Sequence, residues 1–226
     1  MKAFLQFIFF KFLDWVSRTQ LWEDFFKAVG KYNIRFKGYT LFKMSDYFKI
    51  VDKLELGKYY VFVSTDAKSI SSILIKEAVK MASETGYFSH AGHIFPGDDR
   101  TVKLLHMRDI GLVDQLAIDF LKQVDYFCVI ELPIKEENKA EVERRINKVK
   151  EDAINLNIVY DWQQDLTNGD SIIYCSELIY KNFKGLVDNP NFKPRTMYGR
   201  LVFDPDILVD CGTIVYSNHP LFKNFY

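Results

Sequence analysis

The sequence predicts a single α+β domain preceded by a helical extension. Short apolar runs rich in β-branched and aromatic residues alternate along the chain with helical patterns of apolar spacing. The 226 residues are 48% hydrophobic and 27% charged, which is typical of a globular chain that can bury a substantial core. No repeat, low-complexity tract or clear linker divides them. We expect one domain over 1–226, made of a helical extension at 1–55, a core at 56–210 and a C-terminal tail at 211–226.

Residues 1–30 read as a helix that is rich in Phe and Trp. Gln6 and Lys11 break its apolar run and no small-residue cleavage site follows, so the segment is not a clear signal peptide. The uninterrupted apolar stretches are also too short to span a bilayer. Two interpretations remain open: the helix is docked on the domain, which we favour, or it lies in a membrane interface.

The first strand and the first helix of the core follow from local patterns. Residues 56–65 predict a turn followed by a buried strand, because aromatic and β-branched residues follow a glycine. Residues 66–85 predict a helix, because apolar side chains such as Ile70, Ile73 and Leu74 recur at helical spacing.

A β-hairpin is predicted around the turn-forming run at 96–100, which reads PGDDR. Strands at 89–95 and 101–107 flank it. With the turn centred on its middle residue, His90 lies directly opposite His106 on one face of the hairpin. Directly opposed residues have Cβ atoms about 5 Å apart, so the two imidazoles could form a hydrogen bond. A slip of one residue would separate them.

The later elements are predicted in the same way, and glycines and prolines from residue 185 onward predict loops. In order, we expect a short helix at 112–122, a strand at 126–132, a charged amphipathic helix at 139–156, a polar aromatic loop at 157–168 and a short strand near 213–216.

The stretch 172–184 joins a short β-type run to a helical pattern that begins at Cys175. A helix N-terminus carries partial positive charge and free N–H groups, which favour a thiolate and could hold an oxyanion. The alternative interpretation is a buried core cysteine, which is a common fate of free cysteines. Helical spacing places five residues on the core-facing side: Cys175, Leu178, Ile179, Asn182 and Phe183.

Charge and cysteine usage exclude several classes of protein. Thirty basic residues balance 30 acidic ones, so no global basic field argues for nucleic acid. Cys128, Cys175 and Cys211 are widely spaced and form no CxxC pair, which argues against a disulfide framework. This usage suits a reducing compartment, so we expect a cytoplasmic protein, with peripheral membrane contact through residues 1–30 left open.

Nucleophilic chemistry is the function that these residue types favour. Cysteine hydrolysis needs a thiolate, a histidine that shuttles protons and a polar group that orients the histidine. The chain offers Cys175, His90 and His106 for these roles. A neutral imidazole can accept the orienting hydrogen bond in place of a carboxylate or an amide.

A metal site is the competing chemistry, because His90, His106 and Cys175 could together bind zinc. However, His90 and His93 diverge on a strand, and nothing supplies an obvious fourth ligand or an HExxH motif. The chain also lacks a Walker motif and a GxGxxG motif. We therefore expect neither a metal nor another cofactor.

Four stretches carry a resemblance to a known family: FSHAGHIF, VKLLHM, YDWQQDL and IIYCSELIYKNF. They resemble the YiiX-like branch of the circularly permuted NlpC-type, papain-like cysteine hydrolases, to which lecithin retinol acyltransferases are similar permuted relatives. The resemblance covers about 57–210 and implies an antiparallel sheet packed against the helix that bears the cysteine. The order His90, His106, Cys175 is the papain-like cyclic order opened at a different point.

The resemblance implies a role for each site residue. Cys175 is the nucleophile, His90 the general base and acid, and His106 the orienting group, where this branch usually has a glutamate. Tyr160, Tyr174 and the backbone N–H of Cys175 are implied as oxyanion or substrate contacts.

The implied activity is cleavage of an amide bond in a peptide or small amide, by a peptidase or amidase that forms a thioester. An acyltransferase or thioesterase acting on lipid at a membrane surface is an alternative, and a non-catalytic binding module is another. A catalytic role predicts a lowered pKa for Cys175 and an inert Cys128 in the core.

Overall fold

We describe a computed structural model of the chain. It covers residues 43–66, 70–83, 85–155, 158–161, 164–167, 169, 171–197 and 199–222. The predicted helix at 1–30 lies outside the described residues. The described part of the predicted extension contains helix α3 (Met44–Lys53), which buries Ile50 in the core.

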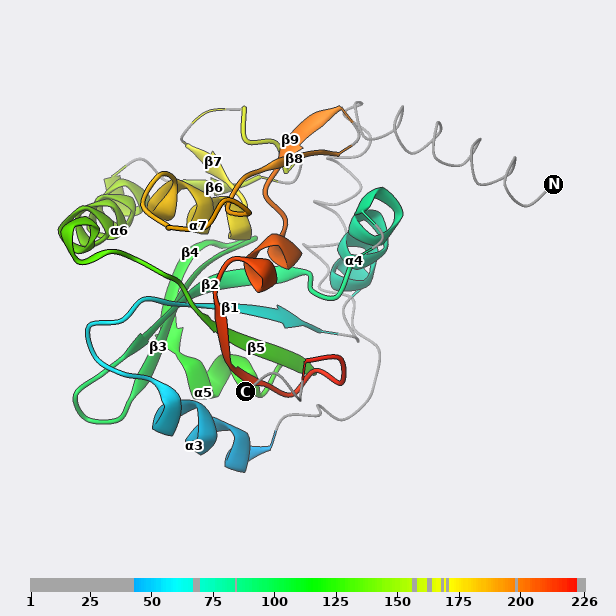
Figure 1. Ribbon diagram of the computed structural model, residues 1–226. Coiled ribbons are helices and arrows are strands. Elements are labelled where there is room, and N and C mark those ends of the chain that lie inside the picture. Colours follow the sequence, from blue (N-terminus) through cyan, green and yellow to red (C-terminus); the bar gives the residue numbers. More distant parts are fainter. Residues whose placement is uncertain are drawn as a thin grey trace.

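A six-stranded antiparallel sheet forms the centre of the structure, with the strand order β10-β5-β1-β2-β3-β4 (Figure 1). All six residues of β1 are buried, as expected for a strand with neighbours on both sides and layers on both faces. This architecture confirms the α+β class. The strands are β1 (Tyr60–Thr65), β2 (His90–Pro96), β3 (Val102–Arg108), β4 (Gly111–Leu116), β5 (Tyr126–Glu131) and β10 (Thr213–Ser217).

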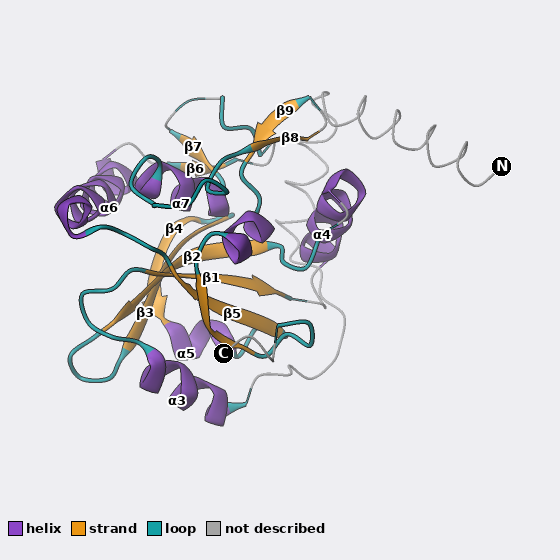
Figure 2. Cartoon of the chain, in the orientation of Figure 1, coloured by secondary structure: helices purple, strands orange, loops and turns teal. Residues whose placement is uncertain are grey.

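Helices cover both faces of this sheet (Figure 2). One face packs against α6 (Lys139–Asn155), α7 (Cys175–Phe183) and the 3₁₀-helix η2 (Pro205–Asp210). The other face packs against α3 and α5 (Ala117–Leu121). The other elements are α4 (Ile70–Ser83), the 3₁₀-helix η1 (Glu136–Asn138), the parallel pair β6 (Val159–Tyr160) and β7 (Ile172–Ile173), and the antiparallel pair β8 (Arg195–Met197) and β9 (Arg200–Val202).

Helix α7 begins at Cys175, as the sequence predicts. Tyr174 precedes the helix with extended backbone, and its N–H donates to the Glu177 carboxylate at 3.3 Å. This bond satisfies one donor at the helix start. All five residues predicted for the core-facing side are buried.

The predicted register of the hairpin is wrong by two residues. His93 lies opposite Leu105, whereas the predicted register required Lys103 there. Continuing the observed register places Gly92 opposite His106. The turn is centred on Asp99 rather than Asp98, since the Gly97 N–H donates to the Thr101 carbonyl at 2.7 Å, and moving the centre by one residue shifts the register by two. A shift of two residues preserves strand alternation, so each side chain keeps its predicted face.

The predicted helix at 112–122 is also wrong over its first half. Residues up to Leu116 form β4, and only α5 is helical. A short turn joins β3 to β4 and ends at Gly111, whose φ of 105° favours glycine. Short apolar runs fit both patterns, and here pairing with β3 decides for a strand.

The other predicted strands and helices of the core occur within a few residues of their expected positions. The segment at 211–226, predicted as a tail, contains β10, which forms one edge of the sheet. Among the described residues, no helix has both the length and the apolar character needed to cross a bilayer.

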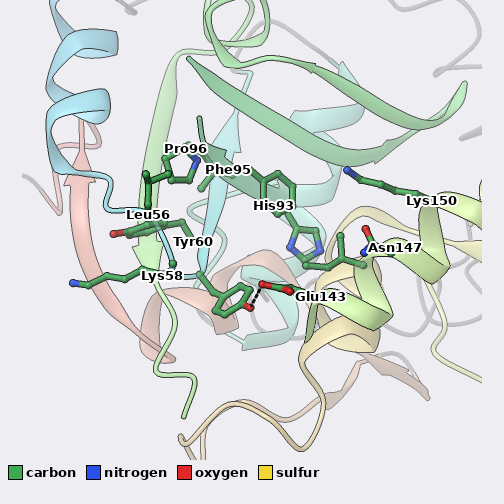
Figure 3. Close-up of a pocket in the computed structure, with 13 residues that line it drawn as sticks. Leu56, Lys58, Tyr60, His93, Phe95, Pro96, Glu143, Asn147 and Lys150 are labelled. Carbon is green, nitrogen blue, oxygen red and sulfur yellow. Dashed lines mark hydrogen bonds between the residues drawn. The ribbon is translucent and has the colours of Figure 1, made fainter. Parts of the chain in front are cut away.

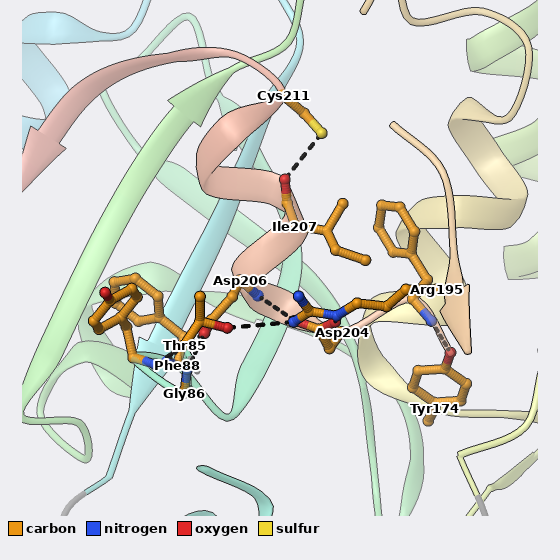
Figure 4. A network of polar contacts seen from close by, with 11 residues as sticks. Thr85, Gly86, Phe88, Tyr174, Arg195, Asp204, Asp206, Ile207 and Cys211 are labelled. Carbon is orange, nitrogen blue, oxygen red and sulfur yellow. Dashed lines mark hydrogen bonds and ion pairs between the residues drawn. The ribbon is translucent and has the colours of Figure 1, made fainter. Parts of the chain in front are cut away.

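A polar network anchors the segment that leads into β2 (Figure 4). The Asp206 side chain, which is 5% exposed, accepts N–H hydrogen bonds from Gly86, Tyr87 and Phe88. Neighbouring Asp204 pairs with Arg195 at 2.5 Å. Helix η2 thereby fixes the chain just before His90.

Candidate active site

Cys175 lies where the start of α7 meets β2. Strand β3 pairs with β2 only from His93 onward, so the backbone of Ala91 has no partner in β3. The Ala91 N–H instead donates to the Cys175 sulfur. The Tyr160 hydroxyl and the Ser176 N–H also donate to this sulfur. The cysteine is therefore held directly beside the residue that follows His90.

His90 and His106 lie within hydrogen-bond distance, as predicted. The distance from His90 Nε2 to His106 Nδ1 is 2.6 Å. In the observed register the two residues are diagonal neighbours, which are normally about 7–8 Å apart at their backbones. Gly92 lies opposite His106 and has no side chain, so the two rings can meet. An alanine Cβ there would lie 2.6 Å from the His106 Cβ.

Gln115 adds a polar contact that the sequence analysis missed. Its Nε2 lies 2.9 Å from His106 Nε2, so both ring nitrogens of His106 have partners. The sequence pattern predicts a helix for this strand, which hides the alternation that puts Gln115 on the histidine face. His106 is 0% exposed, and its ring packs edge-on against Phe62 and Phe120.

Both histidines of this pair are neutral at physiological pH. Burial and the positive charge of Arg108 lower the pKa of His90 to about 3. Burial, His90 and Arg108 lower the pKa of His106 to about 2. Each neutral ring has one N–H and one lone pair, so one ring donates to the other.

The lowered pKa predicted for Cys175 is wrong. Burial raises the pKa of its thiol, although the Ala91 N–H, Tyr160 and Ser176 act in the opposite direction. Only 3% of the residue is exposed, and desolvation disfavours the thiolate more than these donors favour it. Cys175 is therefore a thiol at rest. Burial raises the pKa of Cys128 to about 12, which agrees with an inert core cysteine.

The two candidate tyrosines differ in their surroundings. The Tyr160 hydroxyl reaches the Cys175 sulfur, and burial raises the pKa of Tyr160 well above its ordinary value, so it stays protonated. Tyr174 is 1% exposed, and its hydroxyl accepts the Phe203 N–H at 2.8 Å. These contacts favour a structural role for Tyr174.

His93 points to the opposite face of the sheet, as predicted. Its Nε2 lies 2.8 Å from Asn182 Nδ2, and its ring packs against Phe95 and Phe183. It lines a separate pocket of about 390 Å³, with Lys150 and other side chains from α6 (Figure 3). Neither Cys175 nor the His90–His106 pair contributes to that pocket.

Within the described part of the chain, no three His, Cys, Asp or Glu side chains are grouped so that they could hold a metal ion. The chain matches no protein-family model, no curated protein and no solved structure. The chemistry of the site must therefore be inferred from its own residues.

Proposed function

We propose that this protein is a cysteine hydrolase that cleaves an amide bond, as a peptidase or amidase, through a thioester. The observation that carries the proposal is the placement of Cys175, whose sulfur accepts the N–H of the residue next to His90. His90 in turn is bound to His106 through Nε2. The Cys175 thiol thus lies against the backbone of β2 next to His90, and the neutral His90 ring is bound to His106 of β3.

The roles in the reaction follow from the protonation states. His90 Nε2 is occupied by His106, which leaves Nδ1 to exchange protons. The Cys175 thiol loses its proton to His90 as the sulfur attacks the substrate carbonyl carbon. His90 then gives this proton to the leaving amine, and the carbon–nitrogen bond breaks to leave a thioester.

Water completes the cycle. His90 takes a proton from a water molecule, whose oxygen attacks the thioester carbonyl, and the acid product leaves as Cys175 regains its proton. In both half-reactions His90 is transiently an imidazolium, and His106 accepts the hydrogen bond from its Nε2. A neutral imidazole stabilises this cation less than a carboxylate would.

The raised thiol pKa and the lowered imidazole pKa oppose proton transfer in the empty site. The transfer must therefore accompany attack on a bound substrate. The Tyr160 hydroxyl and the backbone N–H of Cys175 are donors suited to the oxyanion. Tyr160 bonds the sulfur at rest and can turn to the oxyanion once the sulfur carries the acyl group.

The architecture supports a circularly permuted papain-like fold, which we propose for the core. The antiparallel sheet packs against the helix that carries Cys175, and the chain order is His90, His106, Cys175. Strand β10 would then complete the sheet after residue 210.

Covalent acylation tests the proposal without knowledge of the substrate. The protein is incubated with a panel of activated esters and amides, and each cysteine peptide is analysed by mass spectrometry. We expect an acyl group on Cys175 and the same rate in Cys128→Ala. If no probe acylates the protein, or if Cys175→Ala is acylated equally, the protein is a binding module with a core cysteine.

A further inference from the structure

Three polar side chains form a continuous line on one face of the sheet. Gln115 contacts His106 Nε2 at 2.9 Å, and His106 Nδ1 contacts His90 Nε2 at 2.6 Å. His106 is fully buried among aromatic rings, so water does not compete for its nitrogens. The line runs from β4 across β3 to β2 and ends at the ring that would serve Cys175.

The direction of these hydrogen bonds determines which nitrogen of His90 carries its proton. In the structure, the amide nitrogen of Gln115 faces His106 Nε2. That nitrogen can only donate, so His106 Nε2 accepts and His106 Nδ1 carries the proton. His106 then donates to His90 Nε2, and the proton of His90 resides on Nδ1. In this direction His90 Nδ1 has no lone pair for the thiol proton.

The opposite direction combines a half-turn of the Gln115 amide with the other tautomer of each ring, in which the proton has moved from Nδ1 to Nε2 by exchange with solvent. The Gln115 carbonyl oxygen then accepts the His106 Nε2 proton, and His106 Nδ1 accepts the His90 Nε2 proton. His90 Nδ1 is left with a lone pair, which is what a general base requires.

We propose that Gln115 is a positioning residue that sets the tautomer of His90 through His106, and that the productive state presents its carbonyl oxygen to His106. The proposal rests on the hydrolase function proposed above. An amide can adopt both directions, whereas a carboxylate in the same place could only accept. Gln115 is therefore compatible with both tautomers of His90, and passage between them needs both rotation of its amide and the transfer of one proton on each ring.

Two substitutions of Gln115 by side chains of similar length distinguish the two hydrogen-bond directions. Gln115→Glu can only accept at pH 8, so it holds the productive direction. We expect acylation of Cys175 at least as fast as in the wild type and up to about tenfold faster, which is the worth of one hydrogen bond. Gln115→Met removes the acceptor. Acylation should then fall by about tenfold, because a buried N–H on His106 Nε2 would have no partner.

Nitrogen-15 NMR of the histidine rings supplies a readout that does not depend on turnover. Gln115→Glu should place the protons of His106 and His90 on Nε2, and Gln115→Met should place them on Nδ1. Asp114→Asn is the control, because Asp114 lies on the same strand but is exposed and pairs with Lys150. It should leave the tautomers and the rate unchanged.

The outcomes separate the two proposals. Identical tautomers in the wild type and in both Gln115 variants, or acylation rates within twofold of one another, would overturn the role of Gln115. Tautomers that follow residue 115 in a protein that no probe acylates would uphold the positioning role and overturn the hydrolase. Thermal unfolding of each variant identifies any rate loss that comes from misfolding.

Discussion

Alanine at position 92 would place a methyl group against the side chains of His106 and Phe62. Its Cβ would lie 2.6 Å from the His106 Cβ and 2.5 Å from Phe62 Cε1. Carbon atoms in contact are normally about 3.5–4.0 Å apart, so each overlap is about 1 Å. Neither neighbour can yield easily, because both are fully buried and Phe62 stacks on Phe127.

The expected cost has two parts. Overpacking of this kind destabilises by about 1–3 kcal/mol, which lowers the Tm of a chain of this size by about 2–12 °C. His106 must also move away from His90. A displacement of about 1 Å can cost about 100-fold in rate, so Gly92→Ala should acylate Cys175 about 10- to 100-fold more slowly than the wild type.

Thermal unfolding followed by circular dichroism measures the first part, and acylation well below the Tm measures the second. Gly212→Ala is a matched control. Its Cβ would meet the Glu131 carbonyl oxygen and Ile130, beside β5 rather than the histidines. It should be destabilised but should acylate normally once folded. A Gly92→Ala protein with wild-type Tm and rate would show that this contact does not position His106.

Three further predictions concern the thiol and the histidines. His106→Gln should retain more acylation than His106→Ala, and His90→Ala should lose about 10²–10⁴-fold, because only His90 moves a proton; equal rates in His106→Ala and the wild type would show that another group orients His90. Alkylation of Cys175 by iodoacetamide should still be rising at pH 9, because burial raises the pKa of this thiol above its ordinary 9.0, and a plateau below pH 7 would contradict this. Burial lowers the pKa of His90 and His93 to about 3 and that of His106 to about 2, from 6.5 when unfolded. Below pH 6.5 the unfolded chain binds protons that the folded chain does not, so the free energy of unfolding, measured with urea, should be greatest above pH 6.5 and decrease as the pH falls towards 3. His106→Gln should reduce the slope of this free energy against pH by up to about 1.4 kcal/mol per pH unit. An unchanged slope would count against a buried neutral His106.

The parts of the site that depend on local spacing could be predicted from the sequence. The start of α7 at Cys175 follows from helical periodicity alone. The prediction that His90 and His106 share a face is correct although the predicted register is wrong, because an error of two residues leaves the alternation of side chains intact.

The parts that depend on tertiary packing could not be predicted. The pairing of β4 with β3 decides that Gln115 belongs to a strand, and no local pattern contains that information. The burial of Cys175 also depends on segments that are distant in sequence. A helix N-terminus by itself favours a thiolate, but burial raises the pKa of Cys175 and keeps it a thiol.

The carboxylate of Asp206 joins parts of the chain that are made at very different times. Its three backbone partners precede it by 118–120 residues. Synthesis at about 5–20 residues per second would separate their emergence from the ribosome by about 6–24 s. Until Asp206 emerges, three N–H groups at the entrance to β2 lack their acceptor. The strand that carries His90 therefore gains its final anchor only after Cys175 has been synthesised, and contacts of such long sequence separation slow folding.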